Sequence, residues 1–424
     1  MKKVIQPVKG TRDFYPDEMA LRTWLYAQIR DVSESYGYQE YEGPFLESIY
    51  LYAAKSGEAL VKEQAFVFPD RGGNQITLRP ELTPSLARMI AQKQNQLVFP
   101  LRWWSFGPFW RYERPQKGRT REFFQWNADL MGVDLPEADA ELVSVCASLF
   151  EKISLKPDEV KILVNDRRLM EKEISALQIP SERRIDVFHL IDRKEKLSIS
   201  EWEKYVFDQG FNRKQLEGLQ ELVANKKLYQ KSDDLMRFFE AVASLGCEDY
   251  VVYDPSIIRG LDYYTGIVFE AKDIDKEGRA ILGGGHYANL VADVGGEPLP
   301  GVGFAMGDVV LLLVLEKYGK LPNLDCMPAS VLVTVFDEGS LSRSYALAAS
   351  LRGAGFNVVC YPQATKLAKQ LKFADKMGCK FAIIQGPDEL QENSVIVKNL
   401  KEREQITVKR DQLTSELRSF LAEV

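Results

Sequence analysis

The chain has 424 residues, a formal net charge of −6 and 45% hydrophobic residues, which is typical of a soluble globular protein with two or three domains. Two lysines near the N-terminus have no apolar run behind them, and the apolar run Val309 to Leu315 is far shorter than the about 20 residues that cross a bilayer. We therefore expect a cytoplasmic protein without a signal peptide or a membrane span.

Cysteine and histidine usage argues against several kinds of catalytic centre. Five scattered cysteines without a C-x-x-C pair fit reduced thiols in a cytosolic protein. Only two histidines occur, His189 and His286, so we expect no zinc site and no fixed metal site made by the protein. The sequence also contains neither the G-x-S-x-G turn of serine hydrolases nor a P-loop.

The first part of the chain predicts a helix, an antiparallel hairpin and a helical insertion. A helical pattern covers Pro16 to Tyr36. Two aromatic-rich strands, Leu101 to Tyr112 and Phe123 to Val133, are joined by the polar connector Glu113 to Glu122. Charged residues and leucines then recur at helical spacing over residues 165–245, with few strand signals.

Strand-like runs return after the insertion, followed by a glycine cluster and an apolar helix over Gly307 to Tyr318. The last part of the chain alternates strands with helices, which predicts a separate α/β domain with a largely parallel sheet. The predicted strands are Tyr250 to Tyr253, Gly266 to Ala271, 331–336, 357–362, 381–386 and 394–399, and the last two helices are Ser340 to Gly353 and Lys366 to Gly378.

The predicted hairpin carries an unusual set of polar groups. Arg111 and Glu113 are two residues apart on one strand and therefore point to one face, as do Gln125 and Asp129 on the other strand. Burying these groups is costly unless they bind a ligand or one another. A solvated hairpin with salt bridges is the alternative. The connector adds three cations: Lys117, Arg119 and Arg121.

The hairpin segment WRYERPQKGRTREFFQ resembles motif 2 of class II aminoacyl-tRNA synthetases, in the form found in histidyl-tRNA synthetases. The resemblance runs almost end to end. It implies an α+β fold with a class II antiparallel-sheet catalytic domain, a helical insertion, a C-terminal α/β anticodon-binding domain, and a homodimer through motif 1. The other stretches that carry it are KGTRDFYP (9–16), GYQEYEGPFLES (37–48, with Pro44 at the motif 1 proline), TLRPELT (77–83), RGLDYYTG (259–266), LGGGHYANL (282–290) and KLAKQLKFADKMG (366–378).

The resemblance implies that the chain joins an amino-acid carboxylate to the α-phosphate of ATP, with Mg²⁺ accompanying the ATP. Negative charge gathers on the phosphate oxygens in such a reaction, so fixed cations there contribute to catalysis. Arg111 and Arg259 match the family's positions for this role. Glu113 would accept from the adenine amino group and Phe123 would stack on the base, with core packing as the alternative for Phe123.

The resemblance also implies that the amino acid is L-histidine. Glu81 and Thr83 would hold its α-ammonium group. An imidazole needs an acceptor at one nitrogen and a second partner at the other, which a carboxylate and tyrosine hydroxyls provide. Ordinary strand aromatics are the alternative for the tyrosines. The residues expected to line the side-chain pocket are Gln125, Asp129, Tyr263, Tyr264 and Tyr287.

The implied nucleic-acid partner is tRNA(His). The three cations of the connector would touch the acceptor end of the tRNA or the ATP tail. Lysines recur at three- to four-residue spacing near the C-terminus, which indicates a basic helix face that would follow the RNA backbone. A merely solvated face is the alternative. These lysines are Lys366, Lys369, Lys372 and Lys376.

Two departures from the family pattern stand out. The family commonly has G-G-R-Y-D-G-L in its glycine signature, whereas His286 and Ala288 replace the arginine and the aspartate here. The motif 3 arginine that grips ATP falls on Val310. This loss favours the alternative of a non-catalytic paralogue resembling the regulatory subunit of ATP phosphoribosyltransferase, although that regulator usually lacks a C-terminal α/β domain.

The predicted division has four segments. The first part of the catalytic domain, with motifs 1 and 2, covers residues 1–164, and the helical insertion covers 165–245. The second part of the catalytic domain, with the histidine signatures and the motif 3 region, covers 246–320, and the anticodon-binding domain covers 329–424.

Overall fold

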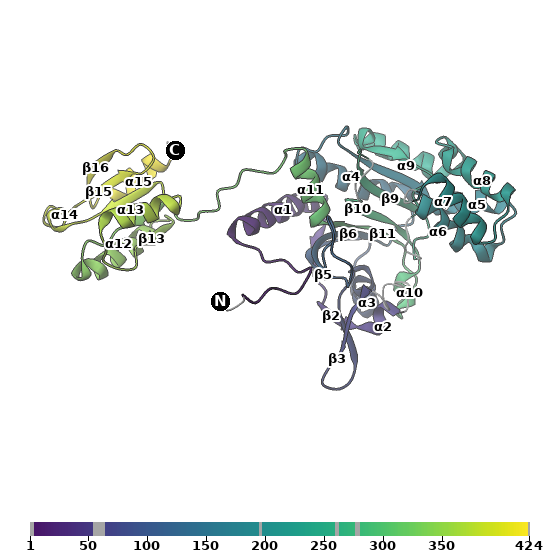
Figure 1. Ribbon diagram of the computed structural model, residues 1–424, viewed down its shortest axis with the longest axis horizontal. Coiled ribbons are helices and arrows are strands. Elements are labelled where there is room, and N and C mark those ends of the chain that lie inside the picture. Colours follow the sequence, from purple (N-terminus) through teal and green to yellow (C-terminus); the bar gives the residue numbers. More distant parts are fainter. Residues whose placement is uncertain (1–3, 54–63, 195–196, 259–262, 276–279, 423–424) are drawn as a thin grey trace. The chain divides into compact units, whose positions relative to one another are not determined.

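The computed structural model describes residues 4–53, 64–194, 197–258, 263–275 and 280–422. The chain forms two compact units, Met1–Pro322 and Asn323–Val424 (Figure 1). No helix in the described ranges is long and apolar enough to cross a membrane.

Eight described strands of the first unit form one mixed sheet, in the order β1-β5-β6-β11-β10-β9-β7-β8. The pair β5–β6 is antiparallel and in register from Leu101↔Met131 to Trp110↔Glu122, which confirms the predicted hairpin. The strands are β1 (Gln39–Glu40), β5 (Leu101–Trp110), β6 (Glu122–Met131), β7 (Val160–Asp166), β8 (Val251–Tyr253), β9 (Ile267–Asp273), β10 (Leu282–Tyr287) and β11 (Gly301–Gly307).

Both faces of this sheet are covered, each by its own hydrophobic core. The larger core packs α1 and α4 against one face, where Trp104 and Trp126 are fully buried. The smaller core lies on the other face, beside α3 and α10, and includes Met131 and Tyr287. A separate three-stranded sheet, β2-β4-β3, belongs to the same unit. The elements are α1 (Pro16–Ser35), β2 (Leu46–Ser48), α2 (Ile49–Ala53), β3 (Phe66–Pro69), β4 (Gln75–Leu78), α3 (Thr83–Lys93), α4 (Pro136–Lys152), α10 (Leu290–Asp293) and α11 (Asp308–Lys317).

The segment between β7 and β8 is helical, as its spacing predicts, and its helices begin at conventional caps. Ser198 with Glu201 and Asn212 with Gln215 form capping boxes that satisfy backbone N–H groups at two helix starts. In Figure 1 these helices gather at one end of the unit. Their bounds are α5 (Arg167–Ala176), α6 (Arg184–Lys194), α7 (Ile199–Asp208), α8 (Arg213–Ala224) and α9 (Asp233–Ser244).

The C-terminal unit has a five-stranded sheet in the order β13-β12-β14-β15-β16. Strand β12 pairs in parallel with both β13 and β14, but β14–β15 and β15–β16 are antiparallel. The predicted alternation of strands and helices is therefore confirmed, whereas the prediction of a largely parallel sheet is wrong. The elements are β12 (Val331–Val333), α12 (Leu341–Gly353), β13 (Val358–Cys360), α13 (Leu367–Lys376), β14 (Phe381–Ile384), α14 (Pro387–Gln391), β15 (Ser394–Asn399), β16 (Gln405–Lys409) and α15 (Leu413–Ala422).

Two local expectations also need correction, and one further segment forms a strand that the sequence did not predict. Strand β5 ends at Trp110, so Arg111 and Glu113 lie in the loop after it and do not share a strand face. The glycine cluster, for which the sequence pattern predicts no element, belongs to the buried strand β10, Leu282–Tyr287. Strand β7 runs to Asp166, so its last two residues fall inside the predicted insertion. Short 3₁₀ turns occupy Gln94–Gln96, Ser181–Arg183, Leu228–Lys231, Glu248–Tyr250 and Glu338–Ser340.

Candidate active site

The pocket-facing side of β6 buries a carboxylate in the middle of the sheet. Asp129 is 3% exposed, and the hydroxyl of Tyr287 donates to its Oδ1 at 2.6 Å. The neighbouring strand makes room for it with Gly303, where an added Cβ would overlap the Asp129 carboxylate. Burial raises the pKa of Asp129 to about 7, and the Tyr287 hydrogen bond only partly opposes that rise. The ionised carboxylate of Asp129 therefore destabilises the folded protein.

Three tyrosine rings lie together beside this carboxylate. The ring centroids of Tyr263 and Tyr264 are 4.8 Å apart, and those of Tyr263 and Tyr287 are 6.1 Å apart in an edge-to-face arrangement. Burial raises the pKa of Tyr263 well above its usual range, with Tyr264 and the carboxylate of Glu81 adding to the effect. The structure thus brings Glu81, Asp129 and all three predicted tyrosines into one region.

Several buried polar atoms in this region have no hydrogen-bond partner among the described residues. They include Oε1 of Gln125 and Nδ2 of Asn127, on the same face of β6 as Asp129, and the hydroxyl of Tyr41. Burial, followed by the charge of Asp129, raises the pKa of Tyr41, so this hydroxyl lies in the same electrostatic environment. Unsatisfied buried polar atoms are rare in native proteins and are costly. They mark positions where a bound ligand would supply the missing hydrogen bonds.

Arg111 is fixed just beyond the end of β5. Its Nε donates to the carbonyl oxygen of Pro80 at 2.9 Å, and its guanidinium carbon lies 5.3 Å from the centroid of the Phe123 ring. Burial lowers the pKa of Arg111, while the carboxylates of Glu81 and Glu113 work against that shift. Thr83 is the first residue of α3 and lies two residues after Glu81.

The connector after β5 holds its own ion pair. Arg119 pairs with Glu113, whose side chain is 8% exposed, and Nε of Arg121 donates to the backbone carbonyl of Glu113 at 3.2 Å. The Arg121 guanidinium also lies 4.1 Å from the Tyr112 ring centroid. Lys117 is exposed. Glu113 is therefore close to Arg111, as predicted, but its carboxylate is already engaged by a cation of the loop.

Phe123 packs in the core, and its stacking on adenine stays a prediction. Its ring stacks on Phe109 with centroids 6.1 Å apart, which is core packing, and its half-buried ring also faces the Arg111 guanidinium. Base stacking and core packing are therefore compatible in this residue. Arg259 lies outside the described residues, so its predicted place beside Arg111 stays a prediction.

The motif 3 region is built differently from the family pattern. Val310 packs against the large hydrophobic core, while Asp308 is 2% exposed and begins helix α11. Asp308 accepts from the backbone N–H of Phe124 at 2.9 Å and from Nη2 of Arg12 at 2.8 Å. The acidic side chain at this position thus ties three segments together: the N-terminal signature, β6 and α11.

Sequence reasoning gave no role to Arg79, which the structure buries completely. Arg79 pairs with Glu42, its Nε donates to the carbonyl of Pro108 at 2.9 Å, and its guanidinium lies between the rings of Phe45 and Phe109, at 4.6 and 4.4 Å. The only sequence signal was the place of Arg79 within TLRPELT, the stretch that resembles the substrate-binding turn of the family. Arg79 fixes the turn that presents Glu81.

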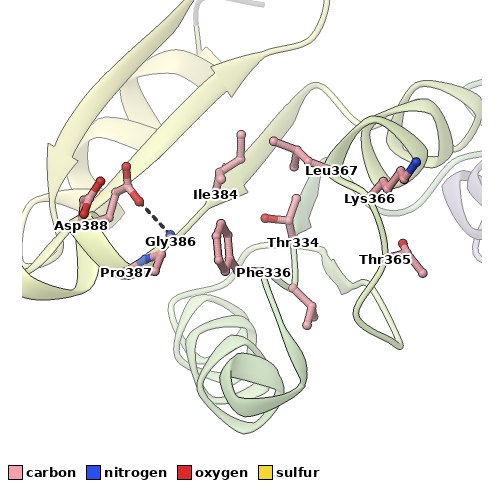
Figure 2. A pocket seen from close by; sticks show the side chains of 11 residues that line it. Thr334, Phe336, Thr365, Lys366, Leu367, Ile384, Gly386, Pro387 and Asp388 are labelled. Atoms are coloured by element: carbon pink, nitrogen blue, oxygen red, sulfur yellow. Dashed lines mark hydrogen bonds between the residues drawn. The ribbon is translucent and has the colours of Figure 1, made fainter.

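The C-terminal unit contains a cavity of about 610 Å³ at the carboxyl ends of β12 and β14 (Figure 2). Thr334 and Phe336 follow β12, Thr365 and Lys366 precede α13, and Glu389 in α14 accepts from the backbone N–H of Gly386 at 2.8 Å. Lys366, Lys369, Lys372 and Lys376 are all exposed. Within the described ranges, no group of three or more His, Cys, Asp or Glu side chains could hold a metal ion.

Comparisons with known proteins agree with this arrangement. The C-terminal unit matches the family described as anticodon binding domain over residues 330–420, and the first unit matches the family described as histidyl-tRNA synthetase over residues 10–308. A synthetase sheet followed by an anticodon-binding domain defines an aminoacyl-tRNA ligase, an enzyme class that uses ATP. The chain belongs to the histidyl-tRNA synthetase family, and the α+β class II fold expected from the sequence is confirmed.

Individual relatives extend over nearly the whole chain. A histidine–tRNA ligase of Leptospira biflexa is 34% identical over 96% of this chain and 95% of its own length. The crystal structure of the histidyl-tRNA synthetase of Nostoc covers 99% of this chain and 100% of its own, with a TM-score of 0.79 and 26% identity. A Bacillus halodurans structure described as an ATP phosphoribosyltransferase regulatory subunit/histidyl-tRNA synthetase covers 89% of this chain and 97% of its own, with a TM-score of 0.72 and 20% identity, a likeness of fold alone.

Proposed function

We propose that this ligase activates L-histidine with ATP to form histidyl-adenylate and then transfers the histidyl group to tRNA(His). The observation that carries the choice of amino acid is the Asp129–Tyr287 pair, buried against Tyr263 in a region with unsatisfied polar atoms. An ionised carboxylate there accepts an imidazole N–H, and the tyrosine hydroxyls serve the other nitrogen. Side chains that lack these groups would leave the buried carboxylate unpaired, which is how such a site rejects analogues.

The activation step would use the arginine beyond β5. Arg111 presents a planar, always charged fork that suits phosphate and carboxylate oxygens. Its anchoring by the Pro80 carbonyl holds that fork before the reaction begins. Arg259 would take the opposite side of the phosphate, and Mg²⁺ would enter bound to ATP rather than in a site made by the protein. The Glu81 carboxylate and the Thr83 hydroxyl would hold the α-ammonium group.

Adenine binding would require a rearrangement of the connector. Phe123 would stack on the base and Glu113 would accept from the adenine amino group, but in this structure Arg119 pairs with Glu113. When ATP enters, Arg119 would exchange this partner for a phosphate oxygen. This assigns Arg119 to the ATP tail, and it leaves Lys117 and Arg121 as candidates for the acceptor end of the tRNA.

The remaining partners follow from the C-terminal unit and the motif 1 region. The exposed lysines of α13 would follow the RNA backbone by charge alone, and the adjoining cavity is roomy enough to receive part of the tRNA. Motif 1 leaves large apolar side chains exposed, Phe45 at 44%, Leu46 at 48% and Tyr50 at 75%. A second copy of the chain would cover them, which supports a homodimer. We place the enzyme in the cytoplasm.

The regulatory paralogue is the second candidate. The specific observation in its favour is Val310, which packs into the core where the family places an arginine that grips ATP. Full-length similarity to histidine–tRNA ligases and the anticodon-binding unit weigh against it.

Aminoacylation with labelled histidine tests the proposal as a whole. We expect the purified protein to charge tRNA(His) with histidine in the presence of ATP and Mg²⁺, and to leave other tRNAs uncharged. A variant in which Lys366, Lys369 and Lys372 are all replaced by glutamine should raise the KM for tRNA by about tenfold or more, because each phosphate contact carries counterion release.

The same variant separates the two half-reactions. Its histidine-dependent ATP–pyrophosphate exchange should match that of the wild-type protein, because these lysines belong to the C-terminal unit and the proposed ATP and histidine sites belong to the first unit. Histidine binding without charging of any tRNA would contradict the proposal and favour the regulatory paralogue. Unchanged KM for tRNA in the lysine variant would show that the lysine face is only solvated.

A further inference from the structure

His286, one of the departures from the family pattern, lies on the face of β10 opposite the tyrosines. Its side chain is 2% exposed, with Nε2 3.1 Å from Oδ1 of Asp134 and Nδ1 3.3 Å from Oδ1 of Asp139. Asp139, in the first turn of α4, is equally buried, whereas Asp134 precedes that helix and is 60% exposed. Neither contact is aligned as a hydrogen bond, so charge attraction holds the ring between the two carboxylates.

The backbone of His286 supports both sides of the proposed histidine pocket. The next residue, Tyr287, carries the hydroxyl that donates to Asp129 at 2.6 Å. The carbonyl oxygen of His286 accepts from the N–H of Thr265 at 2.8 Å, and this bond fixes the segment that bears Tyr263 and Tyr264. The backbone at Gly266 passes close to His286, since a Cβ added there would lie 3.2 Å from the Cβ of His286.

The charges around His286 favour the protonated ring. Burial works against protonation, but Asp139 and then Asp134 outweigh it, so the pKa of His286 is raised, with Arg168 of α5 opposing them. Burial raises the pKa of Asp139 to about 6, so its carboxylate is ionised above that pH; Asp166 at the end of β7 adds to the rise. Among the described residues, Asp134, Asp139 and Arg168 are the charged groups that act on the ring.

The direction of these pKa shifts defines the pH range in which His286 and Asp139 form an ion pair. A histidine whose pKa is raised in the folded state contributes stability that is present below its unfolded pKa and is lost as the pH rises through the folded pKa. The ion pair with Asp139 therefore exists from about pH 6 up to the raised pKa of His286. Above that window, an ionised Asp139 remains buried without its cation.

We propose that His286 is a positioning residue for the amino-acid pocket: as an imidazolium held by Asp134 and Asp139, it fixes the end of β10 and thereby the Tyr287 hydroxyl and the Tyr263–Thr265 segment. This inference rests on the proposed function, because the pocket is the one assigned to histidine. The family's arginine at this position would give the same support at every pH. The histidine makes the affinity of this enzyme for its amino acid dependent on pH.

The test compares the pH profile of histidine binding in the full-length protein with that of the variant His286→Arg. Calorimetric titration with L-histidine from pH 6.5 to 9 gives Kd, and pyrophosphate exchange gives the KM values and kcat. Substrate ionisation and Asp129 are common to both proteins, so the ratio of their Kd values isolates residue 286. We expect the ratio of the wild-type Kd to the variant Kd to grow by about tenfold towards alkaline pH. That is the effect of losing one hydrogen bond of ordinary strength between the pocket and the bound histidine.

A second variant covers the case in which the larger side chain does not fit. Asp134→Asn removes the exposed carboxylate and should move the alkaline loss of histidine affinity to lower pH, with kcat and the KM for ATP within twofold of wild type. A pH profile of Kd that is the same in wild type and both variants would overturn the proposal, even if thermal stability changed. Histidine binding with the expected pH shift but without exchange would refute ligase activity and leave this inference standing. Absence of histidine binding would refute both.

Discussion

Replacing Arg111 by glutamine should lower kcat/KM for histidine-dependent ATP–pyrophosphate exchange by about 10²- to 10³-fold, or roughly 3–4 kcal/mol of transition-state stabilisation. The guanidinium is half-buried, is held by the Pro80 carbonyl and lies against the Phe123 ring, so it is oriented before substrates bind. Glutamine keeps a donor but loses the charge and the bidentate fork. Steady-state exchange at several ATP concentrations measures the effect.

A matched control is available three residues further on. Arg114 lies in the same connector, is exposed and has no role in the proposed reaction, so Arg114→Gln should keep exchange within a few-fold of wild type. Equal losses in both variants would mean that the connector responds only to its total charge. Wild-type exchange in the Arg111 variant would remove Arg111 from the proposed catalytic machinery.

Replacing Asp129 by asparagine should raise the KM for histidine roughly hundredfold, because a hydrogen bond to a buried ionised acceptor is lost. The wild-type protein should show a KM for histidine that rises as the pH falls below about 7, the pKa to which burial raises Asp129. In the asparagine variant, the KM for histidine should not show the part of this rise that comes from protonation of Asp129. Exchange measured from pH 6 to 8.5 supplies both comparisons.

The same substitution should stabilise the protein at alkaline pH. A carboxyl whose folded pKa lies above its unfolded value of 3.8 makes folding less favourable as the pH rises from that value through about 7. The substituted asparagine keeps an acceptor for the Tyr287 hydroxyl without the buried charge, so the Tm at pH 8 should rise while histidine affinity falls. A lower Tm at pH 8 would indicate that Asp129 is a structural residue rather than a binding group.

The parts of the fold with strong local patterns could be predicted from the sequence. Alternating aromatics flank the β5–β6 hairpin, and helical spacing marks the segment between β7 and β8. The strand β10 was hidden because Gly283, Gly284 and Gly285 lack the side chains that identify a strand. Gly284 and Gly285 lie where neighbouring strands and rings come too close for a Cβ, as Gly284 shows against Phe269.

The site residues could be predicted where they belong to a family motif. Their interaction partners could not be predicted where these come from distant parts of the chain. Asp129 and Tyr287, which the motifs assign to one pocket, form a hydrogen bond, and Arg111 lies within reach of the charge of Glu81. The partners of Glu113, Asp308 and His286 could not be foreseen, because each pairs with a residue whose proximity depends on the folded chain: Arg119 across a turn, Arg12 from the N-terminal signature, and Asp139 from α4. The antiparallel half of the C-terminal sheet was missed because strand alternation does not specify direction.

Amino-acid-dependent ATP–pyrophosphate exchange, with each of the twenty amino acids tested in turn in the presence of Mg²⁺, tests the central claim most directly. We expect exchange with L-histidine alone, which would also show that the enzyme works with Val310 in place of the motif 3 arginine. Exchange driven by a different amino acid, or none with any of them from a protein that still binds histidine, would contradict the claim.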